Sequence, residues 1–168
     1  MKQKFLFIVL IIVIFIVQSG VGTVANTVLQ GGVSKVEEVP DDFYGTWVVA
    51  AKEISNPNHD LYASTSIDVW TLCRYGDIIV LSNPVSGASA AITIDDVQGK
   101  TISFSRTSTS NEDGEIGHET PTLTINENTF EGMDKIIIKK YRNNQLFRED
   151  TITYGLKGKK VASCDLFR

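Results

Sequence analysis

The sequence predicts an all-β fold, an antiparallel up-and-down β-barrel of about eight strands. Short apolar or alternating segments recur from residue 43 onward, separated by clusters of Gly, Asn, Asp and Pro that are typical of turns. No segment after Val39 keeps a helical period over three turns. The connections are short, which favours a meander, because a Greek key needs at least one long connection. Closure into a barrel would also remove exposed strand edges.

The first residues are expected to lie outside this domain. Lys2 and Lys4 precede an apolar run from Phe5 to Val17, which has the size of a signal-peptide core and is short for a membrane span. The sequence leaves two alternatives for this N-terminal segment, cleavage near Ala25 or retention as an anchor. Both place the domain outside the cytoplasm. The expected division is a signal peptide or anchor at 1–25, a mobile linker at 26–41 and the β-barrel domain at 42–168.

The strands are expected to follow one another with few long connections. The first begins at Phe43 and ends before the turn cluster Asn56 to Asp60. A long polar loop is expected from Ser108 to His118. The expected strands are Phe43 to Ile54, Ile67 to Leu72, Asp77 to Ser82, Ala88 to Asp95, Thr101 to Thr107, Leu123 to Ile125, Thr129 to Glu131, Lys135 to Tyr141, Leu146 to Tyr154 and Lys159 to Asp165.

The charge of the exported part argues against nucleic acid as a partner. Removing Lys2 and Lys4 leaves 14 basic residues (16 less 2) against 20 acidic ones, a net charge of −6. Nucleic-acid binding needs a basic surface, and anionic lipid headgroups would also repel this domain. Contact with a membrane is therefore expected only through an uncleaved N-terminal segment, and the acidity is interpreted as a contribution to solubility.

The two cysteines, Cys73 and Cys164, are expected to form one disulfide, because an even number of cysteines in an exported chain favours pairing. Two buried free thiols remain an alternative. The bond would close a loop of about ninety residues and add about 4 kcal/mol in the chain-entropy interpretation.

The segment Phe43-Tyr44-Gly45-Thr46-Trp47 resembles the Gly-x-Trp signature at the start of the first strand of lipocalins and of the wider calycin group, which includes avidins. The resemblance implies structural roles for Gly45 and Trp47, with the tryptophan closing one end of the barrel beneath a basic side chain from the last strands. Arg148 and Arg142 are the candidates. It also implies a disulfide between a mid-barrel strand and the C-terminal segment, where Cys73 and Cys164 stand. The family's Thr-Asp-Tyr loop motif is absent.

No group of residues predicts catalysis, a cofactor or a metal site. His59 and His118 each adjoin a carboxylate but lie far apart, and both are interpreted as solvated loop residues. The segment Asn111 to Glu115 only partly matches a calcium loop. Asp95-Asp96 and Glu149-Asp150 cannot converge on one bond, because adjacent strand residues point to opposite faces, so all four are expected to be exposed.

Two functions follow from these observations. The first is a secreted or surface-anchored, lipocalin-like monomer that binds a small apolar or amphipathic molecule by burying it. The second is a barrel with a filled interior that acts as an interaction or inhibitor module of the cell envelope, with Asn56 to Asp60 and Ser108 to His118 as contact loops. An open interior would favour the first function and a solid core the second. No enzyme activity is expected.

Overall fold

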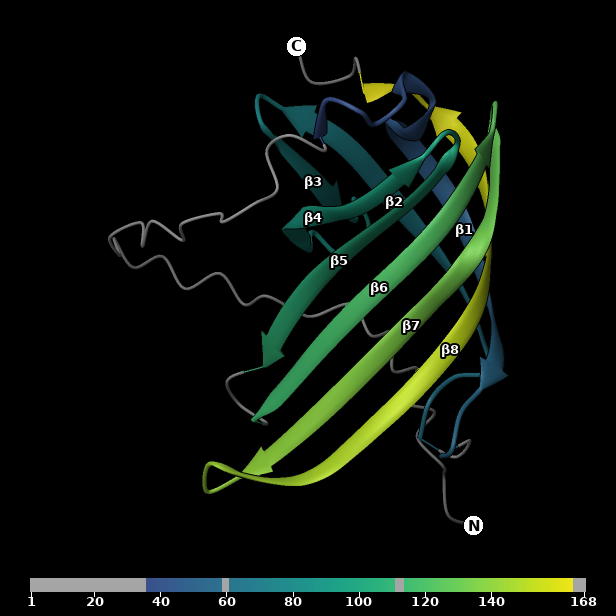
Figure 1. Cartoon of the computed structure of the whole chain (residues 1–168). Helices are drawn as coiled ribbons and strands as arrows, with labels where there is room; N and C mark the ends of the chain where they lie inside the picture. Colours follow the sequence, from purple (N-terminus) through teal and green to yellow (C-terminus); the bar gives the residue numbers. More distant parts are fainter. Residues whose placement is uncertain (1–35, 59–60, 111–113, 165–168) are drawn as a thin grey trace.

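The computed structural model describes residues 36–58, 61–110 and 114–164. Within these residues, eight antiparallel strands follow one another around a closed barrel, which confirms the predicted fold class (Figure 1). One turn of 3₁₀ helix, η1 (Asp41–Phe43), precedes them. The strands are β1 (Gly45–Ser55), β2 (Thr65–Tyr75), β3 (Ile78–Ser82), β4 (Ser89–Gln98), β5 (Thr101–Ser110), β6 (Glu115–Asn126), β7 (Thr129–Arg142) and β8 (Gln145–Ala162).

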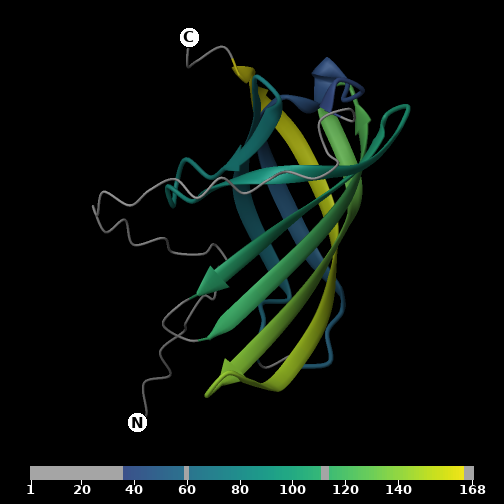
Figure 2. The same cartoon turned by 60° about the vertical axis from the view of Figure 1, so that its left-hand side comes forward.

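The barrel closes through β1, which pairs with β2 on one side and β8 on the other. The longest strands, β6, β7 and β8, run steeply across the molecule side by side (Figures 1 and 2). The ladder between β4 and β5 covers only the first half of β5. It runs from the pair Gln98 and Thr101 to the pair Thr93 and Ser105. Beyond this point β5 pairs only with β6 among the described residues.

The half of the barrel next to η1, called the capped half below, is filled by side chains. Trp47, Phe104 and Phe130 are fully buried there. The ring centroid of Phe130 lies 5.1 Å from that of Trp47 and 6.3 Å from that of Trp70. The Phe130 ring occupies the space inside Gly158, because a Cβ at that position would lie 2.1 Å from its Cε1. Aromatic packing therefore leaves little room at this end.

The signature segment closes the capped end. Trp47 Nε1 donates a hydrogen bond of 3.1 Å to the carbonyl oxygen of Phe43 in η1. A Cβ at Gly45, whose φ is +145°, would lie 2.6 Å from the Ala162 carbonyl oxygen, so the chain requires glycine there. Lys160 Nζ lies 4.9 Å from the Trp47 ring centroid and donates to the Asp42 carbonyl oxygen at 2.6 Å. Burial lowers the pKa of Lys160.

Neither arginine expected above Trp47 lies there. Arg148 pairs with Asp150, and the guanidinium carbon of Arg142 lies 5.0 Å from the Phe147 ring centroid. The expectation was wrong because β8 runs on to Ala162, which places Lys160 opposite Trp47 in the ladder. A lysine thus provides the basic side chain.

Two features tie the chain ends to the barrel. Val36 and Val39 are buried in the core cluster, so the described part of the expected linker packs against the barrel. Cys73 in β2 forms a disulfide with Cys164, with Cα atoms 5.8 Å apart, which confirms the predicted pairing. Because β1 lies between β2 and β8, the bond links β2 to the segment that follows β8, across β1. Residues 1–35 and 165–168 lie outside the described part.

Several expected strands merge into longer ones. The segments expected at 129–131 and 135–141 are both parts of β7, and those at 146–154 and 159–165 overlap β8. Most of the loop expected from Ser108 to His118 is strand, because β5 extends to Ser110 and β6 begins at Glu115. The hydroxyl-rich sequence suggested a loop, whereas pairing between β5 and β6 keeps it extended.

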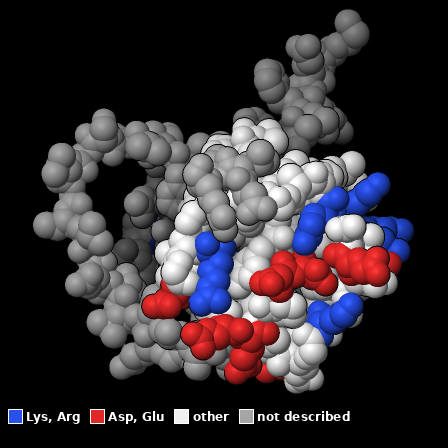
Figure 3. All heavy atoms as spheres, turned by 90° about the horizontal axis from the view of Figure 1, so that it is seen from above, with Lys and Arg blue, Asp and Glu red and all other residues white. Residues whose placement is uncertain are grey.

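Acidic and basic side chains are interspersed on the face seen in Figure 3, where red and blue groups lie next to one another. Lys157 of β8 and Glu131 of β7 also form an ion pair on the outer surface, with charged atoms 3.0 Å apart. This face therefore presents mixed charge without a single basic stripe.

Candidate functional site

Charged side chains point into the barrel in the half away from η1, called the charged half below. On β7 the buried positions alternate through Asp134, Ile136 and Ile138, and on β8 through Asp150, Ile152 and Tyr154. The alternation of a strand thus places carboxylates on the same inner face as isoleucines. The charged half has an interior with both apolar and ionic surface, unlike the capped half.

Asp150 is the centre of one hydrogen-bonded group. Its Oδ2 accepts from Arg148 Nε at 2.6 Å and from the Tyr62 hydroxyl at 2.9 Å, and its Oδ1 accepts from Asn58 Nδ2 at 2.6 Å. Desolvation raises the pKa of Asp150, but the hydrogen bonds from Arg148 and Tyr62 outweigh it and lower the pKa below its usual range. Arg148 Nη2 is buried with no protein partner among the described residues.

A second group joins β5, β6 and β7. Arg106 Nη2 and Nε lie 2.6 and 2.7 Å from Glu119 Oε2, and Glu119 is buried. Asp134 is only 4% exposed, and its Oδ1 has no hydrogen-bond partner within the described chain. Burial and then the nearby charge of Glu119 raise the pKa of Asp134 to about 8, and the charge of Arg106 and then a backbone hydrogen bond from Thr120 oppose this. Asp134 is therefore largely protonated at neutral pH.

Asp68 extends the charged half toward β3. It accepts hydrogen bonds from the Asn83 side chain and, at 3.1 Å, from Trp70 Nε1. A small void of about 40 Å³ lies among Asp68, Trp70 and Arg106 and the segments 81–83 and 88–90. This void has room for about one water molecule.

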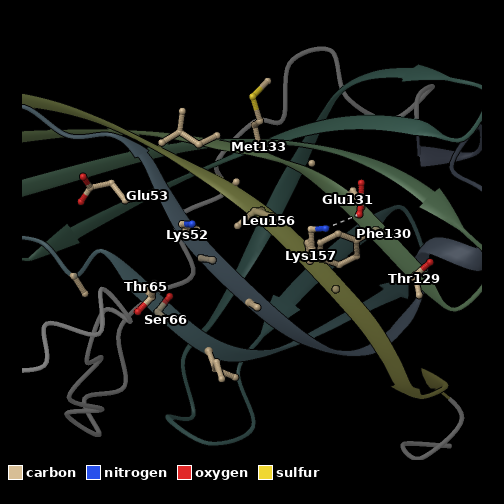
Figure 4. A pocket seen from close by; sticks show the side chains of 18 of the residues that line it. Lys52, Glu53, Thr65, Ser66, Thr129, Phe130, Glu131, Met133, Leu156 and Lys157 are labelled. Atoms are coloured by element: carbon tan, nitrogen blue, oxygen red, sulfur yellow. Dashed lines mark ion pairs between the residues drawn. The ribbon is translucent and has the colours of Figure 1, made fainter.

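A larger hollow, called the outer groove, is lined by residues of β1, β2, β6, β7 and β8, many of them exposed. Its volume is about 1810 Å³. The small residues Ala50 and Gly155 lie along it, and the exposed side chains of Ile54, Ile67 and Met133 border it. Figure 4 shows Lys157 and Glu131 joined by an ion pair beside Phe130, with Met133 at one side and Thr65 and Ser66 at the other.

The structure separates the residues that the sequence had suggested for a site. His118 lies on β6, is exposed, and its Nδ1 is 3.1 Å from the Thr107 hydroxyl. It is a strand residue, contrary to the expected loop. His59 and most of the segment 111–115 lie outside the described residues. Asp95 and Asp96 are exposed as expected, whereas Asp150 is buried, contrary to expectation.

Sequence reasoning missed Glu119 and Asp134. The sequence does contain a signal for Asp134. Buried residues alternate along a strand, and counting back in steps of two from Ile138 and Ile136 places residue 134 on the inner face. The sequence had been divided into two short strands at this point, which hid that period. Nothing local marks Glu119, since its partner Arg106 comes from another strand.

In the part of the chain that the structure describes, no helix has the length and apolar character needed to cross a membrane. Across the same residues, no group of three or more His, Cys, Asp or Glu side chains is placed to hold a metal ion. No protein-family model, curated protein or solved structure matches this chain.

Proposed function

We propose that this protein is an exported binding protein that holds a small amphipathic molecule in the charged half of its barrel. The observation that carries the proposal is a pair of buried polar atoms, Asp134 Oδ1 and Arg148 Nη2, that have no hydrogen-bond partner among the described residues; the Tyr44 hydroxyl, next to η1, is a third such atom. An unpaired buried polar group costs about 1–3 kcal/mol, so a core built for stability alone would not keep such groups. Partners on a bound molecule would account for both.

The surroundings of these atoms suit a molecule with apolar and polar parts. Ile138 and Ile152 are fully buried on the same inner face, and Tyr62 and Tyr154 add aromatic surface. Apolar ligand surface would leave water at about 25 cal/mol per Å², while hydrogen bonds to inner polar groups would set its orientation. The disulfide supports export, because such bonds persist in oxidising compartments.

Native mass spectrometry of the protein purified from its source tests the proposal. We expect an added mass that disappears on denaturation. Methyl NMR then locates the molecule: signals of the inner Ile136, Ile138 and Ile152 should shift on reloading, while those of the outer Ile54 and Ile67 should not. Bare protein that takes up nothing from a source extract would refute the function.

A second candidate function is an interaction module that acts through the outer groove. Ile67 is 74% exposed, Ile54 61% and Met133 56%, so apolar side chains border this hollow in water. Apolar patches of this kind are typical of contact surfaces. The same methyl NMR experiment separates the two functions, because a partner in the outer groove would shift Ile54 and Ile67 and leave the inner isoleucines unchanged.

A further inference from the structure

Two strands of the barrel have unpaired edges in the charged half. The ladder between β2 and β3 ends at Thr71 and Ser82, and the ladder between β4 and β5 ends at Thr93 and Ser105. The strands β3 and β4 therefore join β2 to β5 only in the capped half, where Figures 1 and 2 show them. Past these ladders, β2 and β5 each continue with one edge that pairs with no described strand.

The open edge of β5 carries unpaired backbone groups at Thr107 and Thr109. In an antiparallel ladder, successive residues of a strand turn their backbone groups alternately to one neighbouring strand and to the other. The Ile125 N–H donates to the Lys100 carbonyl oxygen at 2.9 Å, so in this register the even-numbered residues of β5 bond to β6. The N–H and C=O groups of Thr107 and Thr109 therefore point away from β6, where no described strand pairs with them. Both residues are exposed.

The opposite edge, on β2, is partly covered by the protein itself. The Glu53 N–H donates to the Ser64 carbonyl oxygen at 2.8 Å, and the register with β1 then turns the N–H of Val69 toward the open side. This N–H donates to Asp68 Oδ1 at 2.8 Å, and Asp68 also accepts from Trp70 Nε1. A charged side chain of this kind opposes pairing at an edge. No described side chain bonds the outward N–H groups of β5, so its edge is the available one.

We propose that an extended segment of a partner polypeptide adds as a strand to this edge, antiparallel to β5, by bonding the backbone of Thr107 and Thr109. Outward-facing residues of a strand recur about every 6.8 Å, and another extended backbone offers donors and acceptors at this spacing. A folded sheet docked there would bring its next strand toward β2, since residues of β2 and β5 line the same small void. The occupant is therefore a single segment and not a second copy of the barrel. This inference goes beyond the proposed function and does not rest on it.

The neighbouring side chains define the chemistry of this segment. Two of its residues lie opposite Thr107 and Thr109 on the exposed face, where β-branched side chains pair well with threonine. The residue between them points inward beside Ser108, where a void of about 40 Å³ leaves room only for a small side chain. Arg106 is already paired with Glu119 at 2.6 Å, so a charge at this inner position would lack a partner. The segment is therefore uncharged there, with a small residue between two β-branched ones.

A synthetic peptide with the core Thr-Val-Ser-Val-Thr and a lysine at each end for solubility tests the proposal, with amide NMR of the protein as the readout. In the free protein, the amides of Thr107 and Thr109 should exchange quickly with solvent and that of Ser108 slowly, because only Ser108 bonds to β6. Added peptide should shift and protect both threonine amides, with saturation below about 1 mM. Thr107→Pro should weaken binding at least about tenfold, because proline removes an outward N–H that the native ladder does not use.

The matched control is Thr107→Ala, which keeps this N–H and should bind the peptide within about threefold of the wild type. A second probe leaves the protein unchanged and so does not depend on the folding of the proline variant. The peptide N-methylated at both valines, whose amides face β5, should bind at least about tenfold more weakly.

Three results would overturn the proposal. The first is equal binding of the N-methylated peptide, and the second is the absence of any shift of the Thr107 and Thr109 amides at about 1 mM peptide. The third is an edge that is already occupied, seen as protection of both amides in the peptide-free monomer or as a dimer in light scattering. None of these results bears on the ligand proposed for the barrel interior, which the mass of the source-purified protein tests.

Discussion

Replacing Gly158 by alanine should destabilise the protein strongly. A Cβ at this position would lie 2.1, 2.4 and 2.5 Å from the Cε1, Cζ and Cδ1 atoms of Phe130. The ring packs against Trp47 and Trp70 and has little room to move. Expelling it would cost about 3–5 kcal/mol, and a backbone shift that keeps it inside about 1–3 kcal/mol. We therefore expect the free energy of unfolding to fall by about 3 kcal/mol.

The matched control is Gly155→Ala on the same strand. Its nearest neighbour would be Ile54 Cδ1 at 3.3 Å, the tip of an exposed side chain that can move aside. This variant should lie within about 1 kcal/mol of the wild type, or gain slightly from lower unfolded-state entropy. Urea unfolding followed by tryptophan fluorescence measures both variants. Equal stability of Gly158→Ala and the wild type would show that the capped half has room to spare and refute the packing described for Phe130.

Three further predictions concern stability. Replacing Cys73 and Cys164 together by alanine should lower the free energy of unfolding by about 4–5 kcal/mol, because the disulfide spans 91 residues, and thermal unfolding with and without reductant should show the wild type losing a comparable amount. The stability advantage of Asp134→Asn over the wild type should grow as pH rises from about 4 to about 8, because folded wild type keeps a proton on Asp134 that its unfolded chain loses. Parallel plots of unfolding free energy against pH for the two proteins would contradict the raised pKa. Lys160→Gln should lower the free energy of unfolding by about 1 kcal/mol, because it removes the contact with Trp47. The control Lys159→Gln, at an exposed neighbouring position, should leave that free energy unchanged, and an equal effect of both variants would argue against the contact.

The fold class could be predicted because its signals are local. Alternating or apolar segments broken by turn residues mark strands wherever the chain is paired, and short connections allow only neighbouring strands to pair. The limits of the strands were less accurate. Residues 108–118 have the composition of a loop, yet pairing between Ser108 and Gly117 and between Thr107 and His118 holds 108–110 in β5 and 115–118 in β6. Strand formation there depends on a partner strand, which composition does not reveal.

The sequence by itself determined that this chain forms an antiparallel barrel, that Gly45 and Trp47 begin it and that Cys73 and Cys164 are its two available thiols. Only the tertiary structure decided that Lys160 rather than an arginine lies over Trp47, since this depends on the register between β1 and β8. It also decided which carboxylates share the interior. Arg106, Glu119 and Asp134 come from three strands, and side chains from different strands meet only when the sheet closes and its register sets their positions.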